Sequence, residues 1–531
     1  MYRIGRVPKN SPEKLYVGMV NNRFIILVGS YNNEEWIAQS LDVVLNQTHK
    51  NFKIIYYNAC STDRTGEIAE EYSQKDSRIV LFKSPERQLK TWFFEQTLGM
   101  DIHDNDIVCV YDGDDFLANE DVLAYMNEVY NKTNCWMTYG GMIQWNGGDS
   151  TQETFPQNSL PPQEVFEKKL YRQDMWRYSH MRTCRGFLWK RMRLEDYKNK
   201  HDGKYLSMCD LPTVYSFLEM CPANKIFRVP ETIYIWNNSQ ASRGCAETKV
   251  GNNVGQIYEA EIRARQKYDE LQVVVPTLAG GLGNQMFEIA AAASLAKDNN
   301  ALLIINPDEH ILPNQGRNVN TYTNNIFSRI ATDTHPPVKI AYSWEKPFYQ
   351  PIPFQPNVKL GGHYQSFKFF DHNRGYIQSL FSPTDSVRER ILTEYGPILH
   401  KITAIQVRRG DYWKFPDHHP LLTPYYYAKA VKMACPEEIW VFSDDIKWCE
   451  ENLHFDCPVR YIKDEDYIEM YVMSFCKNII ISNSSFGWWA AYLNMRPDTK
   501  VYVPDPWFGK AYINDGFKME DLILPEWIRV K

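Results

Sequence analysis

The sequence predicts an α/β protein with two successive domains, each built on a largely parallel sheet. Short apolar runs typical of buried strands alternate with helix-prone stretches, first over residues 24–111 and again over residues 273–503. With 531 residues, the chain is long enough for about two to four domains, each with a core of its own. Residues 256–271 are charged and helix-prone, so we predict a helical connector between a domain at 1–255 and a domain at 272–531.

The composition excludes several classes of protein. Apolar residues make up 44% of the chain and charged residues 23%, which is typical of a globular protein and excludes a disordered or collagen-like one. With 59 basic and 65 acidic side chains the net charge is −6, so we expect no nucleic acid among the partners. No apolar run is long enough for a transmembrane segment, and residues 1–6 lack the apolar stretch of a signal peptide. The 11 cysteines are scattered without a Cys-x-x-Cys pair, which indicates free thiols and a cytoplasmic location.

The first alternation begins with a strand expected at residues 24–28. A helix is expected at 34–46, and further strands at 53–57, 79–82 and 106–111. The second alternation has strands expected at 273–275, 302–305, 403–407, 439–442, 459–462, 478–481 and 500–503, and helices ending near 296 and spanning 467–476 and 486–494. Because ligands of parallel sheets bind beyond the carboxyl ends of the strands, the polar clusters at these ends are the candidate sites.

A cluster of carboxylates directly follows the strand that ends at Tyr111. The segment Asp112-Gly113-Asp114-Asp115 places three negative charges at one strand end, and they repel one another unless a cation joins them. The spacing of Asp112 and Asp114 suits a hard divalent ion that also holds a diphosphate leaving group. The alternative is a solvated acidic turn.

Residues 24–115 as a whole resemble the nucleotide-sugar-binding half of family 2 glycosyltransferases, which have a GT-A fold. The matching segments are Val28–Asn32, Ser61–Thr65 and Asp112–Asp115. The resemblance implies Mn²⁺ or Mg²⁺ at Asp112 and Asp114. It also implies contacts with the donor from Ser30, Asn58, Asp63, Asp112 and Asp114. The family usually has an acidic pair where this chain has Asn58 and Ala59, so the usual contact with a uracil base is not expected in the same form.

The same resemblance implies a catalytic carboxylate later in the first domain. The best match is Asp210, which would take the proton from the acceptor hydroxyl. The alternative is that Asp210 caps a helix that starts at Leu211-Pro212, because Pro suits the first turn. The segment Ser242-Arg243-Gly244 is a further candidate, for closing over the diphosphate.

A glycine-rich turn lies between a strand and a helix at the start of the second domain. In Gly280-Gly281-Leu282-Gly283-Asn284-Gln285 the glycines allow close approach of the backbone to a ligand, and the helix N-terminus favours an anion. The dinucleotide-binding fingerprint has its third glycine where this chain has Met286, which argues against a dehydrogenase.

Two adjacent arginines and a serine-rich turn follow later strands of the second domain. Arg408 and Arg409 come directly after a buried strand, where a guanidinium needs an anionic partner and can hold two phosphate oxygens. The alternative is a structural pair with Asp411. The turn Ser482–Phe486 offers hydroxyls and backbone N–H groups to a phosphate, and its alternative is an ordinary capping turn.

Together these segments resemble family 11 glycosyltransferases, the α-1,2-fucosyltransferases. The matching segments are Gly280–Phe287, Gly362–Ser366, Val407–Tyr412, Phe442–Asp445 and Met473–Trp489. The resemblance implies a GT-B-type fold, GDP-β-L-fucose as donor, inversion at the anomeric carbon and no metal.

Residue roles in the second domain follow from this resemblance. Arg408 or Arg409 would hold the β-phosphate, and Asp444 would pair with guanine. The remaining donor contacts would come from Gly281, Gly283, Asn284, Asn483, Ser484, Ser485 and Phe486. Asp411 is a possible catalytic base, although a carboxylate bound by an arginine has a lowered pKa and is a poor one. Gln406 and His363 stand where the family usually has His and an aromatic residue.

The sequence therefore predicts a bifunctional glycosyltransferase. A metal-dependent GT-A domain would transfer a sugar from an unidentified nucleotide sugar, and a fucosyltransferase without a metal would transfer L-fucose from GDP-fucose to a hydroxyl of a glycan acceptor. One alternative is that only the fucosyltransferase is active, with the first domain a lapsed or glycan-binding module. The other is a non-catalytic, lectin-like scaffold.

Overall fold

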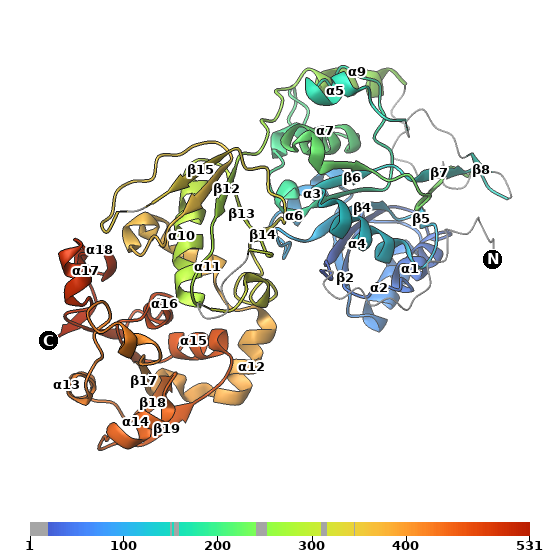
Figure 1. The fold of residues 1–531 in the computed structure, drawn as a ribbon. Helices are drawn as coiled ribbons and strands as arrows, with labels where there is room; N and C mark the ends of the chain where they lie inside the picture. Colours follow the sequence, from blue (N-terminus) through green and yellow to red (C-terminus); the bar gives the residue numbers. More distant parts are fainter. Residues whose placement is uncertain (1–19, 149–150, 153–158, 240–251, 310–315, 345) are drawn as a thin grey trace. The chain divides into compact units, whose positions relative to one another are not determined.

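The computed structural model describes residues 20–148, 151–152, 159–239, 252–309, 316–344 and 346–531 (Figure 1). The candidate segment Ser242-Arg243-Gly244 lies outside these residues. The chain divides into two compact units, unit 1 (Met1–Leu271) and unit 2 (Gln272–Lys531). Both are α/β, which confirms the predicted fold class. No helix among the described residues combines the length and the apolar character needed to cross a bilayer.

The main sheet of unit 1 contains four parallel strands that carry the predicted donor site. In the described residues its strand order is β10-β6-β9-β4-β1-β2-β3. The strands are β1 (Phe24–Ser30), β2 (Phe52–Asn58), β3 (Ile79–Lys83), β4 (Ile107–Asp112), β6 (Met137–Tyr139), β9 (Arg182–Arg185) and β10 (Ile226–Arg228). Strand β9 runs antiparallel to β4 and β6. The register pairs Ser30 with Asn58 and Gly29 with Asp112, so the carboxyl ends of β1, β2 and β4 meet at one edge.

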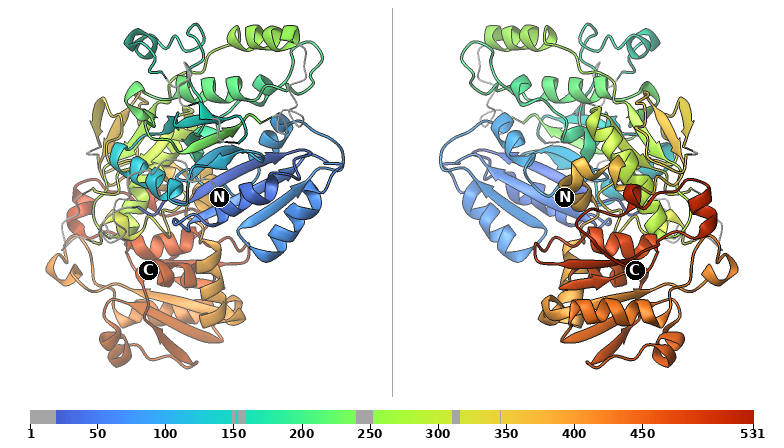
Figure 2. Two further views of the ribbon diagram at one scale, coloured as in Figure 1. Left: turned by 90° about the vertical axis from the view of Figure 1, so that its right-hand side faces the viewer. Right: turned by 90° about the vertical axis from the view of Figure 1, so that its left-hand side faces the viewer.

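Helices cover both faces of this sheet because its central strands are apolar throughout. Phe24, Ile26 and Val28 pack with helices on one face, while the intervening Ile25 and Leu27 are buried on the other. The helices on the first face are α1 (Ile37–Leu45), α2 (Thr65–Lys75) and α4 (Val122–Thr133). The two blue helices α1 and α2 lie side by side below the sheet in the left view of Figure 2. On the other face lies α3 (Lys90–Thr97).

A second, small sheet extends unit 1 beyond the acidic strand end. Its order is β5-β11-β7-β8, with β5 (Phe116–Leu117), β7 (Met142–Trp145), β8 (Thr151–Gln152) and β11 (Tyr234–Asn237). Strand β11 pairs with β5, which follows the carboxylates directly. Tyr234 and Asn237 of β11, more than a hundred positions further along the sequence, thereby donate hydrogen bonds to Asp115.

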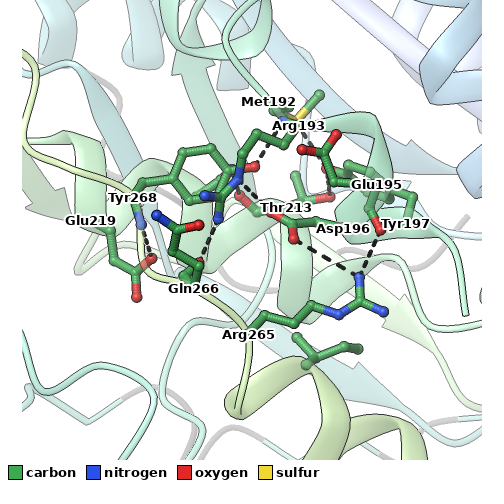
Figure 3. A network of polar contacts seen from close by, with 12 residues as sticks. Met192, Arg193, Glu195, Asp196, Tyr197, Thr213, Glu219, Arg265, Gln266 and Tyr268 are labelled. Atoms are coloured by element: carbon green, nitrogen blue, oxygen red, sulfur yellow. Dashed lines mark hydrogen bonds and ion pairs between the residues drawn. The ribbon is translucent and has the colours of Figure 1, made fainter. Parts of the chain in front are cut away.

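The segment predicted as a connector is bonded to unit 1 (Figure 3). It contains most of helix α9 (Asn252–Arg263), after which the chain continues without helix to Leu271. Tyr268 donates its backbone N–H to Glu219 Oε2 at 2.9 Å, and its hydroxyl accepts from the N–H of Arg193 at 2.7 Å. Arg265 donates to the carbonyl of Glu195 at 3.1 Å. These bonds fix residues after α9 against the helices of unit 1.

Unit 2 contains two parallel sheets in series. The first has the order β14-β13-β12-β16-β15, with β12 (Val273–Pro276), β13 (Leu302–Ile305), β14 (Ala331–Thr332), β15 (Ile340–Ser343) and β16 (Val358–Gly361). The second has the order β19-β18-β17-β20-β21-β22, with β17 (Ile402–Val407), β18 (Glu438–Ser443), β19 (Val459–Ile462), β20 (Asn478–Ile480), β21 (Lys500–Pro504) and β22 (Ile528–Val530). Every strand pair in both sheets is parallel.

Helices cover both faces of the second sheet (Figures 1 and 2). Ala404 and Phe442 pack toward α12 (Asp385–Tyr395), α15 (Asp466–Ser474) and α16 (Ser485–Tyr492). Ile405 and Val441 pack toward α13 (Pro424–Ala434) and α14 (Ile446–Asn452). This alternation of two apolar faces explains why the strands read as continuous apolar runs.

Close packing of α10 (Leu282–Asp298) against α16 brings the two sheets of unit 2 together. A Cβ atom at Gly283 would lie 2.5 Å from the carbonyl carbon of Ser485, so only glycine fits here. Phe287 packs on Trp488 and Trp489, which are fully buried. The glycine-rich turn and the serine turn, 200 residues apart in the sequence, are therefore neighbours.

Candidate active sites

The loops after β1 and β4 approach each other closely at the predicted donor site of unit 1. Ser30 donates its hydroxyl to the side-chain carbonyl of Asn33. A Cβ at Gly113 would lie 2.9 Å from Ser30 Oγ, so the Asp-Gly-Asp turn needs its glycine. Ser30 and Asp112 thus lie at one edge, as the sequence predicts for parallel strands.

Asn58 and Asp63 are occupied by the turn that follows β2. The side-chain oxygen Oδ1 of Asn58 accepts from the hydroxyl of Ser61 at 2.7 Å and from the backbone N–H of Ser61 at 3.1 Å. Asp63 accepts from the N–H groups of Thr65 at 3.0 Å and Glu34 at 3.1 Å. Burial would raise the pKa of Asp63, but the hydrogen bonds from Thr65 and Glu34 outweigh it and lower the pKa. Both side chains shape the turn.

Three potential metal ligands converge at the end of β4. Oxygen or nitrogen atoms of Asp112, Asp115 and His180 all lie within 4.8 Å of one another. Asp114, the ligand predicted together with Asp112, is not in this group. Burial, with the neighbouring Asp114 and Asp112 carboxylates, raises the pKa of Asp115 well above its usual value. Tyr234 donates to Asp115 Oδ2 at 2.7 Å.

His180 is held in its neutral form. Burial, followed by the positive charge of Arg182, lowers its pKa to about 3. The ring stacks on Tyr234 with ring centres 4.9 Å apart. Because a guanidinium can only donate, the hydrogen bond from Arg182 Nη2 uses the Nε2 lone pair of this neutral ring, so a cation here would have to displace Arg182.

Lys90, at the start of α3, already places a positive charge on the predicted metal site. Its ammonium forms an ion pair with Asp112 Oδ1. Burial would lower the pKa of Lys90, yet the Asp112 carboxylate outweighs it and raises the pKa. Conversely, burial would raise the pKa of Asp112, and Lys90 holds it below its usual value. Asp112 is therefore ionised, and its Oδ1 is paired with Lys90.

The predicted catalytic base Asp210 is bound to an arginine. It is the first residue of helix α7 (Asp210–Met220), and Arg182 Nη1 lies 2.9 Å from its Oδ1. Burial would raise its pKa, but the Arg182 guanidinium outweighs burial and holds the pKa of Asp210 well below its usual range. A carboxylate with so low a pKa is a weak proton acceptor at neutral pH.

A cavity of about 1020 Å³ in unit 2 collects most of the predicted fucosyltransferase residues. Those that line it are Gly281, Gly283, Asn284, Arg408, Asp411, Asp444, Asn483, Ser484, Ser485 and Phe486. Arg409 is not among the lining residues. The structure thus assembles one site from the ends of β12, β17, β18 and β20.

Only one of the two adjacent arginines faces the cavity. Arg408 lies between two carboxylates, with Nη2 2.7 Å from Asp411 Oδ1 and Nη1 2.9 Å from Asp444 Oδ2. Arg409 points elsewhere: its guanidinium stacks on Trp448 at 3.8 Å and pairs with Asp445 at 3.3 Å. Arg408 is therefore the cavity's candidate phosphate ligand, and Arg409 is used in packing.

The glycine-rich and serine turns form one hydrogen-bonded wall of the cavity. Asn284 Oδ1 accepts from Ser485 Oγ at 2.7 Å and from Gln365 Nε2 at 2.9 Å. Ser484 Oγ accepts from the N–H of Phe486 at 3.3 Å and so caps α16, the alternative considered for this turn. Asn483 donates to the carbonyl of Pro420 at 3.0 Å.

A buried carboxylate and a cavity-lining histidine form a pair that the sequence did not predict. Glu288 on α10 is 1% exposed, and its oxygens accept from the N–H of Ala279 and face Nδ1 of His363, both at 2.8 Å. Burial raises the pKa of Glu288 to about 7. The hydrogen bond with Glu288 raises the pKa of His363. By contrast Gln406, on β17, is buried and accepts from Ser482.

Comparison with known protein families assigns each half of the chain to a family of glycosyltransferases. The model of glycosyl transferase family 11 matches residues 246–531, and that of glycosyl transferase family 2 matches residues 25–195. The chain belongs to glycosyl transferase family 11. It is a fusion of a family 2 domain and a family 11 domain, and the predicted order of a GT-A fold followed by a GT-B-type fold is confirmed.

Curated relatives are glycosyltransferases of bacteria and animals. The O-antigen biosynthesis glycosyltransferase WbnK of Escherichia coli is 28% identical over 319 residues, covering 48% of this chain and 99% of WbnK. An alpha-1,2-colitosyltransferase of Escherichia coli is 26% identical over 294 residues, covering 49% of this chain and 100% of the relative. Galactoside alpha-(1,2)-fucosyltransferase 2 of Oryctolagus cuniculus is 28% identical over 273 residues, covering 47% of this chain and 75% of the relative. The family 11 domain of this chain is therefore a glycosyltransferase.

Proposed function

We propose that unit 2 transfers L-fucose from GDP-fucose to the 2-hydroxyl of a galactoside in a glycan, with inversion. The family 11 match and the relative named as a galactoside alpha-(1,2)-fucosyltransferase support this donor and linkage. The colitosyltransferase relative supports a donor that carries a deoxysugar. The scattered cysteines favour a reducing, cytoplasmic setting.

The observation that carries this proposal is Arg408 in the cavity. As the bond from the sugar to the diphosphate breaks, negative charge grows on the leaving phosphate oxygen. A guanidinium held between Asp411 and Asp444 is positioned before the reaction and stabilises that charge without a metal ion. The backbone N–H groups at the start of α16 add favourable dipoles on the same wall.

The test incubates the protein with GDP-fucose and lactose, measures the release of GDP and identifies the linkage in the product. The proposal predicts a 2-fucosylated galactose and no release of nucleotide from UDP sugars by unit 2. A lectin-like scaffold releases no GDP.

For unit 1 we propose metal-dependent transfer from a second nucleotide sugar. Asp112, Asp115 and His180 would hold the ion, and their mixed oxygen and nitrogen donors suit Mn²⁺ better than Mg²⁺. When bound, the ion neutralises charge on a diphosphate leaving group. Asp112 is ionised and His180 is neutral, but the ion would have to replace Lys90 at Asp112 Oδ1 and Arg182 at His180 Nε2. Lys90 adds a fixed positive charge beside the same group.

A second candidate is that only unit 2 is active. The ion pair between Asp210 and Arg182 favours this candidate, because it makes Asp210, the predicted proton acceptor of unit 1, a weaker base. A panel of nucleotide sugars, tested with and without Mn²⁺ on the Arg408→Gln variant, distinguishes the two. Metal-dependent release of a nucleotide supports two activities, and silence with every donor supports the second candidate.

A further inference from the structure

The Glu288–His363 pair lies beside the fucosyltransferase cavity, which His363 lines, and comes from α10 and the loop after β16, whereas Arg408 follows β17. His363 follows the carboxyl end of β16 and lines the cavity, with 58% of its side chain exposed. Glu288 lies behind it on α10 and is 1% exposed. The pair therefore joins a buried carboxylate to an accessible imidazole.

Hydrogen bonding determines which ring nitrogen is available. His363 Nδ1 lies 2.8 Å from Glu288 Oε1, and since the ionised form of Glu288 can only accept, Nδ1 carries the hydrogen in that form. In the described part of the chain Nε2 makes no hydrogen bond, so in the neutral ring its lone pair is free. This is the arrangement in which a carboxylate orients an imidazole that takes up a proton.

The backbone holds the imidazole firmly in place. Gly362 has φ +116°, and a Cβ there would lie 2.5 Å from the carbonyl oxygen of Trp344. Tyr364 on the other side has φ +47° and is buried against Trp344 and Phe369. His363 is thus fixed between two residues whose conformation leaves the loop little freedom.

The two cavity carboxylates that follow β17 and β18 are already engaged. Asp411 and Asp444 both bind Arg408, at 2.7 Å and 2.9 Å. Gln406 has no titrating group and accepts from Ser482. His363 alone among these residues combines access to the cavity with a carboxylate behind it.

We propose that His363 is the general base of fucosyl transfer and that Glu288 is the residue that positions it. This rests on the proposed fucosyltransferase function. The acceptor oxygen forms a bond to the anomeric carbon while the bond from that carbon to the phosphate oxygen breaks. The bonding pair leaves with GDP, whose charge faces Arg408, and the acceptor proton passes to His363 Nε2.

The charges around the pair predict a pH dependence. Glu288 faces Glu309, which is paired with Lys359 at 3.1 Å, and His363 faces Glu288. The hydrogen bond with Glu288 raises the pKa of His363, so on acidification the imidazole takes up a second proton at a higher pH than a free histidine would. Nε2 then has no lone pair to offer, and kcat falls on the acidic side.

The experiment compares kcat, the pH profile and the Kd for GDP in four forms of the full chain with GDP-fucose and lactose. His363→Gln lowers kcat about 10²-fold to 10⁴-fold and removes the acidic limb, with the Kd for GDP unchanged. Glu288→Gln lowers kcat less and moves the limb to lower pH, because the imidazole loses its negative neighbour. The matched control is His372→Gln, since His372 also pairs with a carboxylate, Asp298 at 2.8 Å, but does not line the cavity. Its kcat is unchanged.

Each outcome decides the proposal. If the wild type transfers fucose and His363→Gln keeps its kcat and acidic limb, the base is not His363, while the proposed function stands. If both histidine variants lose activity equally, the effect is not specific to the cavity and the proposal fails. If the wild type binds GDP but transfers no fucose, the proposed function fails and His363 has no such role.

Discussion

The guanidinium of Arg182 lies 2.9 Å from the carboxylate of Asp210, the residue predicted as the catalytic base of unit 1. Arg182 is 5% exposed and comes from β9, an antiparallel strand next to the acidic β4. This pair makes Asp210 a stable anion and links α7 to the main sheet.

Replacing Arg182 with Gln is expected to lower the free energy of unfolding at pH 7. The folded-state pKa of Asp210 is depressed, so its stabilising effect is present above its unfolded pKa and is lost as pH falls through the folded value. Because Asp210 is partly exposed, the loss is about 1–2 kcal/mol rather than that of a fully buried pair. Urea denaturation of the variant and the wild type at pH 7 and pH 3 measures it. A difference that grows on acidification would contradict the ion-pair explanation.

Chelation is expected to separate the two activities. EDTA abolishes nucleotide release by unit 1, where Asp112, Asp115 and His180 converge, and spares fucosyl transfer by unit 2, where Arg408 faces the cavity. Initial rates of release of each nucleotide, with Mn²⁺ added back, measure this. Equal sensitivity of both rates to EDTA would contradict the division into a metal-dependent and a metal-independent site.

The adjacent arginines are expected to differ sharply. Arg408→Gln lowers kcat of fucosyl transfer about 10²-fold to 10³-fold, because it removes the fixed positive charge from the cavity. Arg409→Gln has a far smaller effect on kcat, because its guanidinium packs on Trp448 and pairs with Asp445. Steady-state kinetics with GDP-fucose and lactose compare the two variants. Equal losses would mean that both side chains reach the donor.

Apolar periodicity was enough to predict the central strands and the edge strands β3 and β19, but not every edge strand. β1 and β17 are buried throughout or nearly so, and such strands read as apolar runs. β15 was not predicted, since its four residues are largely exposed at the edge of a sheet. An exposed edge strand carries little hydrophobic signal.

The candidate sites were predicted at the strand ends, but their partners were not. Asp112 and Arg408 follow strands directly, so the sequence indicates them. By contrast, Lys90, His180 and Glu288 lie on other parts of the fold, and no local sequence pattern connects them with the strand ends that carry Asp112 and Arg408. The sequence also does not show which of the adjacent Arg408 and Arg409 faces the cavity, because the conformation of the loop after β17 determines the direction of each side chain.

The contact between α10 and α16 gives a stability prediction that is independent of activity. Gly283→Ala is expected to lower the free energy of unfolding by about 1–3 kcal/mol, because its Cβ would lie 2.5 Å from the carbonyl carbon of Ser485 and would force the helices apart. The matched control is Gly375→Ala in α11 (Arg374–Leu380), where a Cβ meets nothing within 4 Å. That change is expected to be neutral or stabilising by up to about 1 kcal/mol, because alanine favours the helix. Thermal and urea unfolding of both variants measure the contrast, and a Gly283→Ala protein as stable as Gly375→Ala would show that the helix contact yields without cost.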